Sequence, residues 1–195
     1  MKGGLLCQKK EMTKVRKDGK QHAVTLLTVV PQQIVRYKSI EKDWYSAAVV
    51  GIHPVSKEGK TEYQQMIEFS IDDEFVQAYA VWSAVSTDLI DGKELVAVSG
   101  VSKGKWFQGA MKRFNLKWGQ KTHGSKFHRQ VWSMGNRKPR RVQKGHPHAG
   151  RMWWAQITIK DRPVLGVYKL ENEVVVWVKG AVPGSYNGMV SLLID

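Results

Sequence analysis

The stretch "VSKGKWFQGAMKRFNLKWGQKTHGSKFHRQVWSMGNRKPRRVQKGHPHAGRMWWAQ", residues 101–156, separates two groups of short apolar segments in this chain of 195 residues. It contains no Asp or Glu and is dense in Lys, Arg, Gly and Trp. Between Lys103 and Arg151 the Gly, Pro and Lys content is too high for a packed core, and these about fifty residues far exceed an ordinary connection within a domain. We therefore interpret it as an insertion that is either disordered or ordered by a binding partner.

The segments on both sides of this stretch are typical of β-strands. They are short, enriched in β-branched residues and separated by breaks such as "KDGK", "ENE" and "VPGSYNG". This pattern predicts an antiparallel sheet that closes into a small barrel, with an exposed turn at "DDE", residues 72–74. The predicted strands are residues 22–30, 32–38, 45–52, 95–101, 155–160, 164–170, 173–179 and 189–194. We expect residues 1–101 and 152–195 to form the barrel body and residues 102–151 to form a basic extension.

One short helix is predicted inside the extension. In "WFQGAMKRF" the residues Phe107, Ala110, Met111 and Phe114 follow an i, i+3, i+4, i+7 spacing. This spacing favours a helix whose apolar stripe packs on the barrel, and a base-stacking face is the alternative.

The charge of the chain is concentrated in one third of its length. Residues 95–160 hold fifteen Lys and Arg and no acidic residue, so the remainder has 31 − 15 = 16 basic residues against 17 acidic ones, a net charge of −1. No second basic segment is visible. Fifteen cations without internal counter-ions repel one another unless an external polyanion neutralises them. Nucleic acid fits best, because the segment lacks the amphipathic stripe of a helix on an anionic membrane.

Other classes of function lack the residues that they need. In "GVSKGKW" the glycines Gly100 and Gly104 are one residue too close for a phosphate-binding loop, and Trp106 stands where its Ser or Thr belongs. His123, His128, His146 and His148 have no Cys pair beside them for zinc. The extension has no carboxylates for acid–base catalysis. We expect no enzyme, no cofactor, no metal and no small-molecule substrate.

Nothing in the sequence predicts membrane insertion or secretion. No window approaches 18 consecutive apolar residues, and the apolar run near the N-terminus is too short for a signal peptide. The single cysteine, Cys7, cannot form an internal disulfide, and we expect it to be a small half-buried core thiol in a cytoplasmic protein.

Several motifs resemble one family. "SGVSKGKWFQGAMKRFN", "THGSKFHR", "SMGNRKP", "AGRM" and "VKGAVPG" occur in this order, after the opening "MKGGLLCQKKEMTKV". Together they resemble the bacterial form of the universal large-subunit ribosomal protein L-three family from end to end. The resemblance implies a mainly β fold, a six-stranded barrel of the type found in translation proteins, interrupted by a long basic extension with a short helix. It also implies a structural protein of the cytoplasmic ribosome, with the extension threading into large-subunit rRNA toward the peptidyl transferase centre.

The resemblance further implies a role early in subunit assembly and neighbours from the L-fourteen and L-nineteen families. Glycines let the backbone approach RNA closely, Arg offers a planar fork to phosphate, and His can bind a phosphate or a 2′-hydroxyl. The candidate RNA-binding residues are those of the matched motifs and the other cations of the extension: Ser102, Lys103, Gly104, Lys105, Lys112, Arg113, Lys117, Lys121, His123, Gly124, Ser125, Lys126, His128, Arg129, Gly135, Asn136, Arg137, Lys138, Arg140, Arg141, Lys144, Gly150 and Arg151.

Seven of the eight tryptophans stand where the family resemblance leads us to expect glycine; Trp177, in a predicted strand, is the exception. They are Trp44, Trp82, Trp106, Trp118, Trp132, Trp153 and Trp154. We hypothesise that these positions are UGA codons that the source lineage reads as glycine. The alternative is that the tryptophans are real and stack on rRNA bases.

A second class of function remains open at this point. The barrel of a free RNA-binding or RNA-remodelling factor would act as an oligonucleotide-binding module and exchange between targets. Such a factor would not stay with large subunits through a high-salt wash.

Overall fold

A computed structural model describes residues 2–57, 60–137, 140–141, 143–171 and 173–194. It divides the chain into two units. The body contains residues Met1–Ser102 and Gln156–Asp195, and the extension unit contains residues Lys103–Ala155. We describe each unit by itself.

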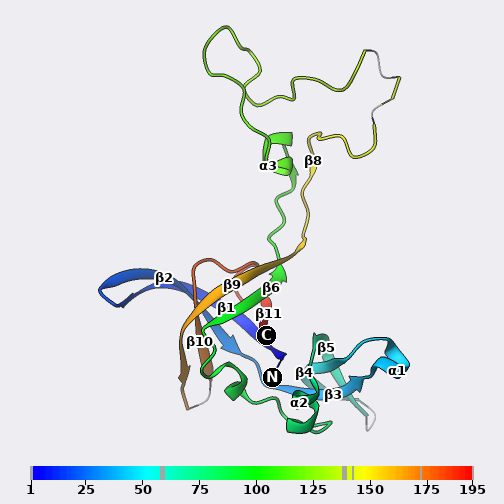
Figure 1. Ribbon diagram of the computed structural model, residues 1–195, viewed down its shortest axis with the longest axis vertical. Helices are drawn as coiled ribbons and strands as arrows, with labels where there is room; N and C mark the ends of the chain where they lie inside the picture. Colours follow the sequence, from blue (N-terminus) through cyan, green and yellow to red (C-terminus); the bar gives the residue numbers. More distant parts are fainter. Residues whose placement is uncertain (1, 58–59, 138–139, 142, 172, 195) are drawn as a thin grey trace. The chain divides into compact units, whose positions relative to one another are not determined.

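The body is built around a closed antiparallel barrel of six strands in the order β1-β11-β6-β9-β10-β2 (Figure 1). The strands are β1 (Gly3–Lys17), β2 (Lys20–Val29), β6 (Leu95–Val101), β9 (Gln156–Lys169), β10 (Val174–Lys179) and β11 (Met189–Ile194). The predicted mainly β fold and its six-stranded ring are therefore confirmed. The extension unit leaves the barrel after β6 and returns into β9, two strands that pair with each other from Val101↔Gln156 onward.

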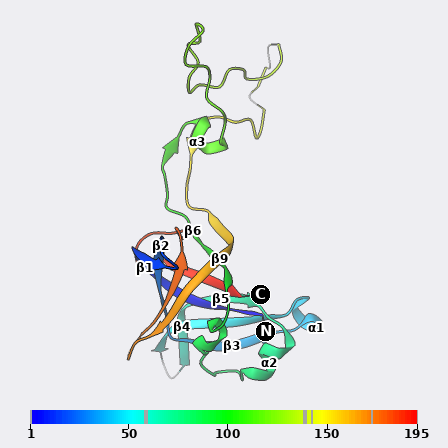
Figure 2. The ribbon, with the colours of Figure 1, turned by 60° about the vertical axis from the view of Figure 1, so that its left-hand side comes forward.

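Strands β3 (Gln32–Lys38), β4 (Ala47–Lys57) and β5 (Lys60–Ser70) form a separate three-stranded sheet (Figure 2). The prediction that residues 32–38 and 45–52 join the barrel was wrong. Alternating apolar residues show that a strand has a buried face but do not identify the strand beside it. Two further strands of the body, β1 and β5, were missed, and β9 unites two segments that were predicted as separate strands.

Short helices complete the body. They are α1 (Ile40–Asp43), α2 (Asp73–Ala78) and the 3-10 helix η1 (Thr87–Ile90). The "DDE" segment is exposed as expected, but it begins α2 rather than forming a turn: Asp72 is the N-cap, and the buried Phe75 anchors the helix. In the described part of the chain, no helix is long and apolar enough to span a membrane.

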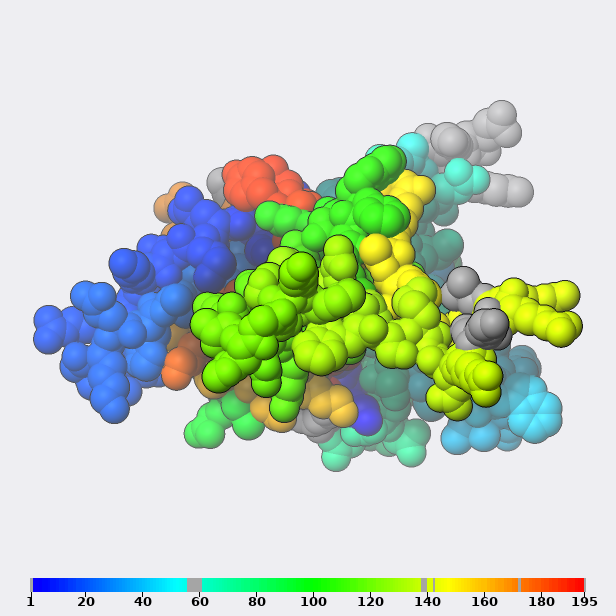
Figure 3. Space-filling view, turned by 90° about the horizontal axis from the view of Figure 1, so that it is seen from above, coloured from blue at the N-terminus to red at the C-terminus, as the bar shows by residue number. Residues whose placement is uncertain are grey.

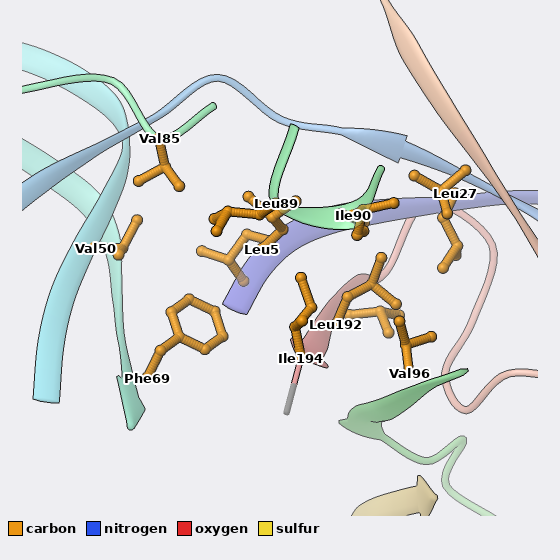
Figure 4. Packing of buried hydrophobic residues seen from close by; sticks show 14 of the residues in the cluster. Leu5, Leu27, Val50, Phe69, Val85, Leu89, Ile90, Val96, Leu192 and Ile194 are labelled. Atoms are coloured by element: carbon orange, nitrogen blue, oxygen red, sulfur yellow. The ribbon is translucent and has the colours of Figure 1, made fainter. Parts of the chain in front are cut away.

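One hydrophobic cluster extends from the barrel to the three-stranded sheet (Figure 4). Leu5, Leu27 and Leu192 come from barrel strands, whereas Val50 and Phe69 come from β4 and β5. Where β1 passes Phe69, a Cβ on Gly4 would collide with the ring, so this close approach requires glycine. The buried side chain of Gln32 also joins the two sheets, since its Oε1 accepts a hydrogen bond from the backbone N–H of Leu6 at 3.0 Å.

Cys7 lies in this core with no exposed surface, so it is fully buried rather than half-buried. Burial raises the pKa of its thiol far above the ordinary value, because the thiolate would be desolvated. Cys7 is thus a packing residue with an unreactive sulfur.

Candidate nucleic-acid interface

The two ends of the extension unit are tied together by a short antiparallel ladder. Strand β7 (Phe107–Gln108) pairs with β8 (Gly150–Arg151), with Phe107 opposite Arg151. Beside it, the N–H of Lys105 donates to the carbonyl of Met152 at 2.9 Å, and the N–H of Met152 donates to the carbonyl of Trp106 at 2.7 Å. The ladder therefore brings candidate residues from both ends of the insertion, Lys105 and Arg151 among them, to one place.

Helix α3 (Ala110–Phe114) follows this ladder (Figure 1). Ala110 and Met111 are buried as the apolar spacing predicts, but Phe107 lies in β7 and is 63% exposed, so the predicted four-residue stripe was too long. We also predicted that this helix packs on the barrel. The helix and the barrel belong to different units, so this packing stays a prediction.

Arg113, on α3, contacts the returning chain. Its guanidinium donates to the carbonyl of His148 at 3.1 Å and lies so close to Gly150 that a Cβ there would collide with it. Glycine at position 150 leaves room for this guanidinium, which stands at the flexible end of its side chain and would have to shift if a Cβ were present.

Residues 119–128 form a closed loop. The N–H of Gly119 donates to the carbonyl of His128 at 3.2 Å, and Nδ1 of His128 lies 3.0 Å from the carbonyl oxygen of Gln120. His123 (φ 61°) and Gly124 (φ 75°) make the turn between them. One imidazole nitrogen of His128 is thus used to close the loop, while the side chain of His123 is exposed.

The charge of the extension unit lies on its surface. Every Lys and Arg side chain that the structure describes between residues 103 and 151 is exposed, and Lys138 lies outside the described residues. With no acidic residue in this part of the sequence, the field around the unit is uniformly positive. The described cations are Lys103, Lys105, Lys112, Arg113, Lys117, Lys121, Lys126, Arg129, Arg137, Arg140, Arg141, Lys144 and Arg151.

The remaining candidates are small residues in turns or at the edge of the body. Ser102 is the last residue of the body before the extension unit and is half-buried. Ser125 Oγ accepts the N–H of Phe127 at 3.3 Å, and exposed Asn136 follows Gly135, whose φ of 129° favours glycine. Gly104 faces Trp154, whose Nε1 would lie 2.9 Å from a Cβ at that position.

Several guanidinium groups lie over exposed aromatic rings, which the sequence reasoning did not predict. Arg151 is 3.7 Å from the ring centroid of Trp153 and 4.8 Å from that of Trp106, and Arg129 is 4.7 Å from that of Trp118. Such cation–π pairs at exposed sites are worth about 0.5–1 kcal/mol each. If these positions are glycine, both arginines are free to turn toward phosphate.

The backbone at three of the tryptophans is left-handed. Trp44, Trp82 and Trp106 have φ values of 68°, 71° and 55°, which glycine adopts readily and bulky residues adopt at a cost. All seven tryptophans in question are exposed, by 43% to 90%. The other four have ordinary φ values, and Trp177 behaves differently, because it lies in β10 and stacks on Tyr168 with ring centroids 4.1 Å apart. The UGA hypothesis thus gains a conformational argument at three positions.

Among the described residues, no group of three or more His, Cys, Asp or Glu side chains lies close enough to hold a metal ion. His146 and His148 do lie near each other, with ring centroids 5.2 Å apart. The surroundings are cationic, which disfavours a divalent metal.

Comparison with known proteins places this architecture in a family. The family model for ribosomal protein L3 matches residues 7–173. The chain belongs to the ribosomal protein L3 family. The large ribosomal subunit protein uL3 of Borreliella afzelii is 35% identical over 199 residues, covering 96% of each chain. The corresponding protein of Geobacter sulfurreducens is 32% identical over 205 residues, covering 97% of this chain and 96% of its own.

These matches confirm the resemblance that the motifs indicate, and they extend over both units. The basic extension is therefore part of a chain that is related to L3 proteins over nearly its full length, rather than an unrelated insertion.

Proposed function

We propose that the chain is a structural constituent of the large ribosomal subunit and that its extension unit binds large-subunit rRNA directly. The observation that carries this proposal is the extension unit itself, whose described Lys and Arg side chains are all exposed and whose sequence offers them no carboxylate. Relatives that match over about their whole length are proteins of the large ribosomal subunit, which supports rRNA as the polyanion.

The extension unit has the chemistry for backbone recognition. Arg137, Arg140 and Arg141 present planar forks to phosphate oxygens, and lysines such as Lys121 and Lys126 act as point charges on the 119–128 loop. The exposed imidazole of His123 supplies a donor for a phosphate or a 2′-hydroxyl. Binding of this kind depends mainly on phosphate contacts and should weaken steeply as salt rises.

Several finer features follow from the family resemblance. The extension unit would thread through large-subunit rRNA toward the peptidyl transferase region and buttress it. The chain would join early in subunit assembly and would neighbour proteins of the L-fourteen and L-nineteen families in the cytoplasmic ribosome. A long cationic segment without a core of its own suits this role, since RNA both neutralises and orders it.

Sedimentation through a sucrose gradient after a high-salt wash tests the proposal against the competing role of a free RNA-binding or RNA-remodelling factor. A structural constituent stays in the large-subunit fractions. Quantitative release into light fractions would favour the free factor and contradict the proposal. Relatedness along the whole chain to large-subunit proteins is the observation that favours the structural role.

A paired variant tests the part assigned to the extension unit. Lys121→Gln with Lys126→Gln removes two exposed charges from the extension unit, and Arg36→Gln with Lys42→Gln removes two exposed charges from the three-stranded sheet and α1. The first pair should lower the slope of log K against log salt for rRNA binding by about 1.5–2, whereas the second should leave it nearly unchanged. Equal slopes for both pairs would argue against phosphate contacts by the extension.

A further inference from the structure

The hairpin that β1 and β2 form extends past the barrel. Within the described strand pairing, β1 is joined to β11 only through Gly3–Gln8, and β2 is joined to β10 only through Val24–Thr28. Residues 14–22 therefore form a two-stranded ribbon that extends past the ladders of the barrel (Figures 1 and 3). Near its turn, Nζ of Lys17 donates to the carbonyl of Leu165 in β9 at 3.4 Å. Two strands alone are marginally stable in water, so such a ribbon needs either an optimised turn or a partner.

The turn of this ribbon is well formed. Asp18 (φ 51°) and Gly19 (φ 74°) occupy a two-residue loop between Lys17 and Lys20, which are directly opposite each other. Two positive φ angles in an Asp-Gly loop match the type I′ turn, whose twist fits a hairpin. The turn thus fixes the pairing register of the two strands, and the register fixes the face on which each side chain lies.

This register gathers positive charge that the linear sequence disperses. The ribbon carries Lys14, Arg16, Lys17 and Lys20 against the single acid Asp18, a net charge of 4 − 1 = +3. Side chains alternate along β1, so Lys14 and Arg16 lie on one face, about 7 Å apart, while Lys17 and its cross-strand neighbour Lys20 lie on the other. All four are exposed.

The charge arrangement is unfavourable in the isolated protein. Lys17 and Lys20 are like charges directly opposite each other, a pairing that destabilises a hairpin. Apolar burial contributes little, because Val15 and His22 are only half-buried and the other residues of the ribbon are exposed. A polyanion would remove the repulsion. Because cations lie on both faces of a thin ribbon, the fitting partner is one that presents anions on both sides, as two neighbouring phosphate backbones do.

We propose that the ribbon is a second RNA-binding element, separate from the extension unit, that lies between two phosphate backbones of large-subunit rRNA. Lys14 and Arg16 contact one backbone, and Lys20 contacts the other. Lys17, whose Nζ donates to the carbonyl of Leu165 in β9 at 3.4 Å, adds its positive charge to the face of Lys20. The proposal rests on the proposed function for the identity of the RNA. It adds a contact surface on the body, outside both the candidate RNA-binding residues named from the sequence and the segment in which the positive charge is concentrated.

Directed cleavage of the RNA tests this inference, and the buried Cys7 makes the experiment clean. Its sulfur has no exposed surface and a raised thiol pKa, so it will not react with a thiol-specific probe in the folded protein. Gln21→Cys in the full chain then offers one exposed thiol on the ribbon, in ordinary strand conformation, for attachment of Fe(II)-EDTA. Met66→Cys, 58% exposed on β5, is the matched probe elsewhere on the body, and Ser133→Cys is the probe in the extension unit.

Each labelled protein is assembled into large subunits, and hydroxyl radicals are generated. We expect the Gln21→Cys probe to cut rRNA in two strand segments that differ from those cut from position 133. If position 133 cuts rRNA and position 21 does not, or if position 21 instead cleaves a neighbouring protein, the inference is overturned and the proposed function stands. If no probe cuts rRNA, both fail.

A charge-matched pair gives a second readout in the full chain. Arg16→Gln with Lys20→Gln removes one cation from each face of the ribbon without touching the core. This variant should lower the slope of log K against log salt for rRNA binding by about 1.5–2, whereas Arg36→Gln with Lys42→Gln should not. A small and equal change in both variants would show that only the overall charge matters and would overturn the inference.

Discussion

Substitution of Trp44 tests whether the chain is built for glycine at this position. Trp44 is the C-cap of α1, with φ 68° and ψ 1°, and its N–H donates to the carbonyl of Ile40 at 3.1 Å. A left-handed residue after a short helix is the position that glycine most often occupies. The side chain is 90% exposed, so the body gains little from the indole.

The informative comparison is between Trp44→Gly and Trp44→Ala, since both remove the same indole. A left-handed backbone costs an L-residue about 1–2 kcal/mol, which alanine retains and glycine avoids. Glycine loses about 0.5–1 kcal/mol more conformational free energy than alanine on folding. The midpoints of these two ranges predict that Trp44→Gly is more stable than Trp44→Ala by about 0.75 kcal/mol. For a chain of this size, that corresponds to about 1–4 °C in Tm.

Trp177 provides the control in the same protein. It lies in β10 and stacks on Tyr168, so both substitutions there should be strongly destabilising, with alanine more stable than glycine. Urea denaturation of the full chain, followed by far-UV circular dichroism, measures all four variants. If Trp44→Ala proves as stable as Trp44→Gly, the strain argument is refuted.

Three further predictions follow from the same structure. The gene should carry UGA at the seven tryptophan positions other than Trp177, and the intact mass of the protein from its own cells should fit glycine there; UGG codons would end the hypothesis. Gln32→Ala should destabilise the body by about 1–3 kcal/mol in a denaturant titration, because the buried N–H of Leu6 loses its acceptor. Lys169, 2.7 Å from Asp88, holds the pKa of that carboxyl below its usual value, mainly by hydrogen bonding. Because folding lowers the pKa of Asp88, the pair stabilises the body fully at pH values above the pKa that Asp88 has in the unfolded chain. This stabilisation is lost as the pH falls through the pKa that Asp88 has in the folded protein. Lys169→Met should raise the pKa of Asp88 in an NMR titration.

Strand positions were predictable from sequence where most side chains of the strand are at least partly buried, because burial imposes apolar residues. Residues 32–38, 95–101 and 189–194 match β3, β6 and β11 residue for residue. Strand β1 was missed because its second half, "QKKEMTKVRK", leaves the barrel and has no buried face to impose apolar residues. Strand β5 was missed for a similar reason, since most of its described side chains are exposed.

The extension could be predicted from composition because charge without counter-ions is a local property of the sequence. Its internal contacts could not, since they join residues far apart in the chain: Arg113 meets His148, and Gly119 meets His128. Motif matching assigned Gly150 and His128 to RNA, while the structure also places Gly150 in the β7–β8 ladder and uses His128 to close a loop. A matched motif therefore combines residues that touch the ligand with residues that shape the chain around it.

The ribbon, in contrast, is a basic surface that could not be predicted from composition. Between Lys14 and Lys20 an acidic residue and a glycine interrupt the cations, and charge counting over the whole body finds a balance near zero. Only the type I′ turn and the antiparallel register place Lys17 opposite Lys20 and put Lys14 and Arg16 in one row. A basic surface made by strand pairing is thus hidden from a linear search, whereas one made by composition is not. The contributions of the ribbon and of the extension unit to RNA binding must be distinguished by variants that remove equal charge from each, because net charge alone does not distinguish them.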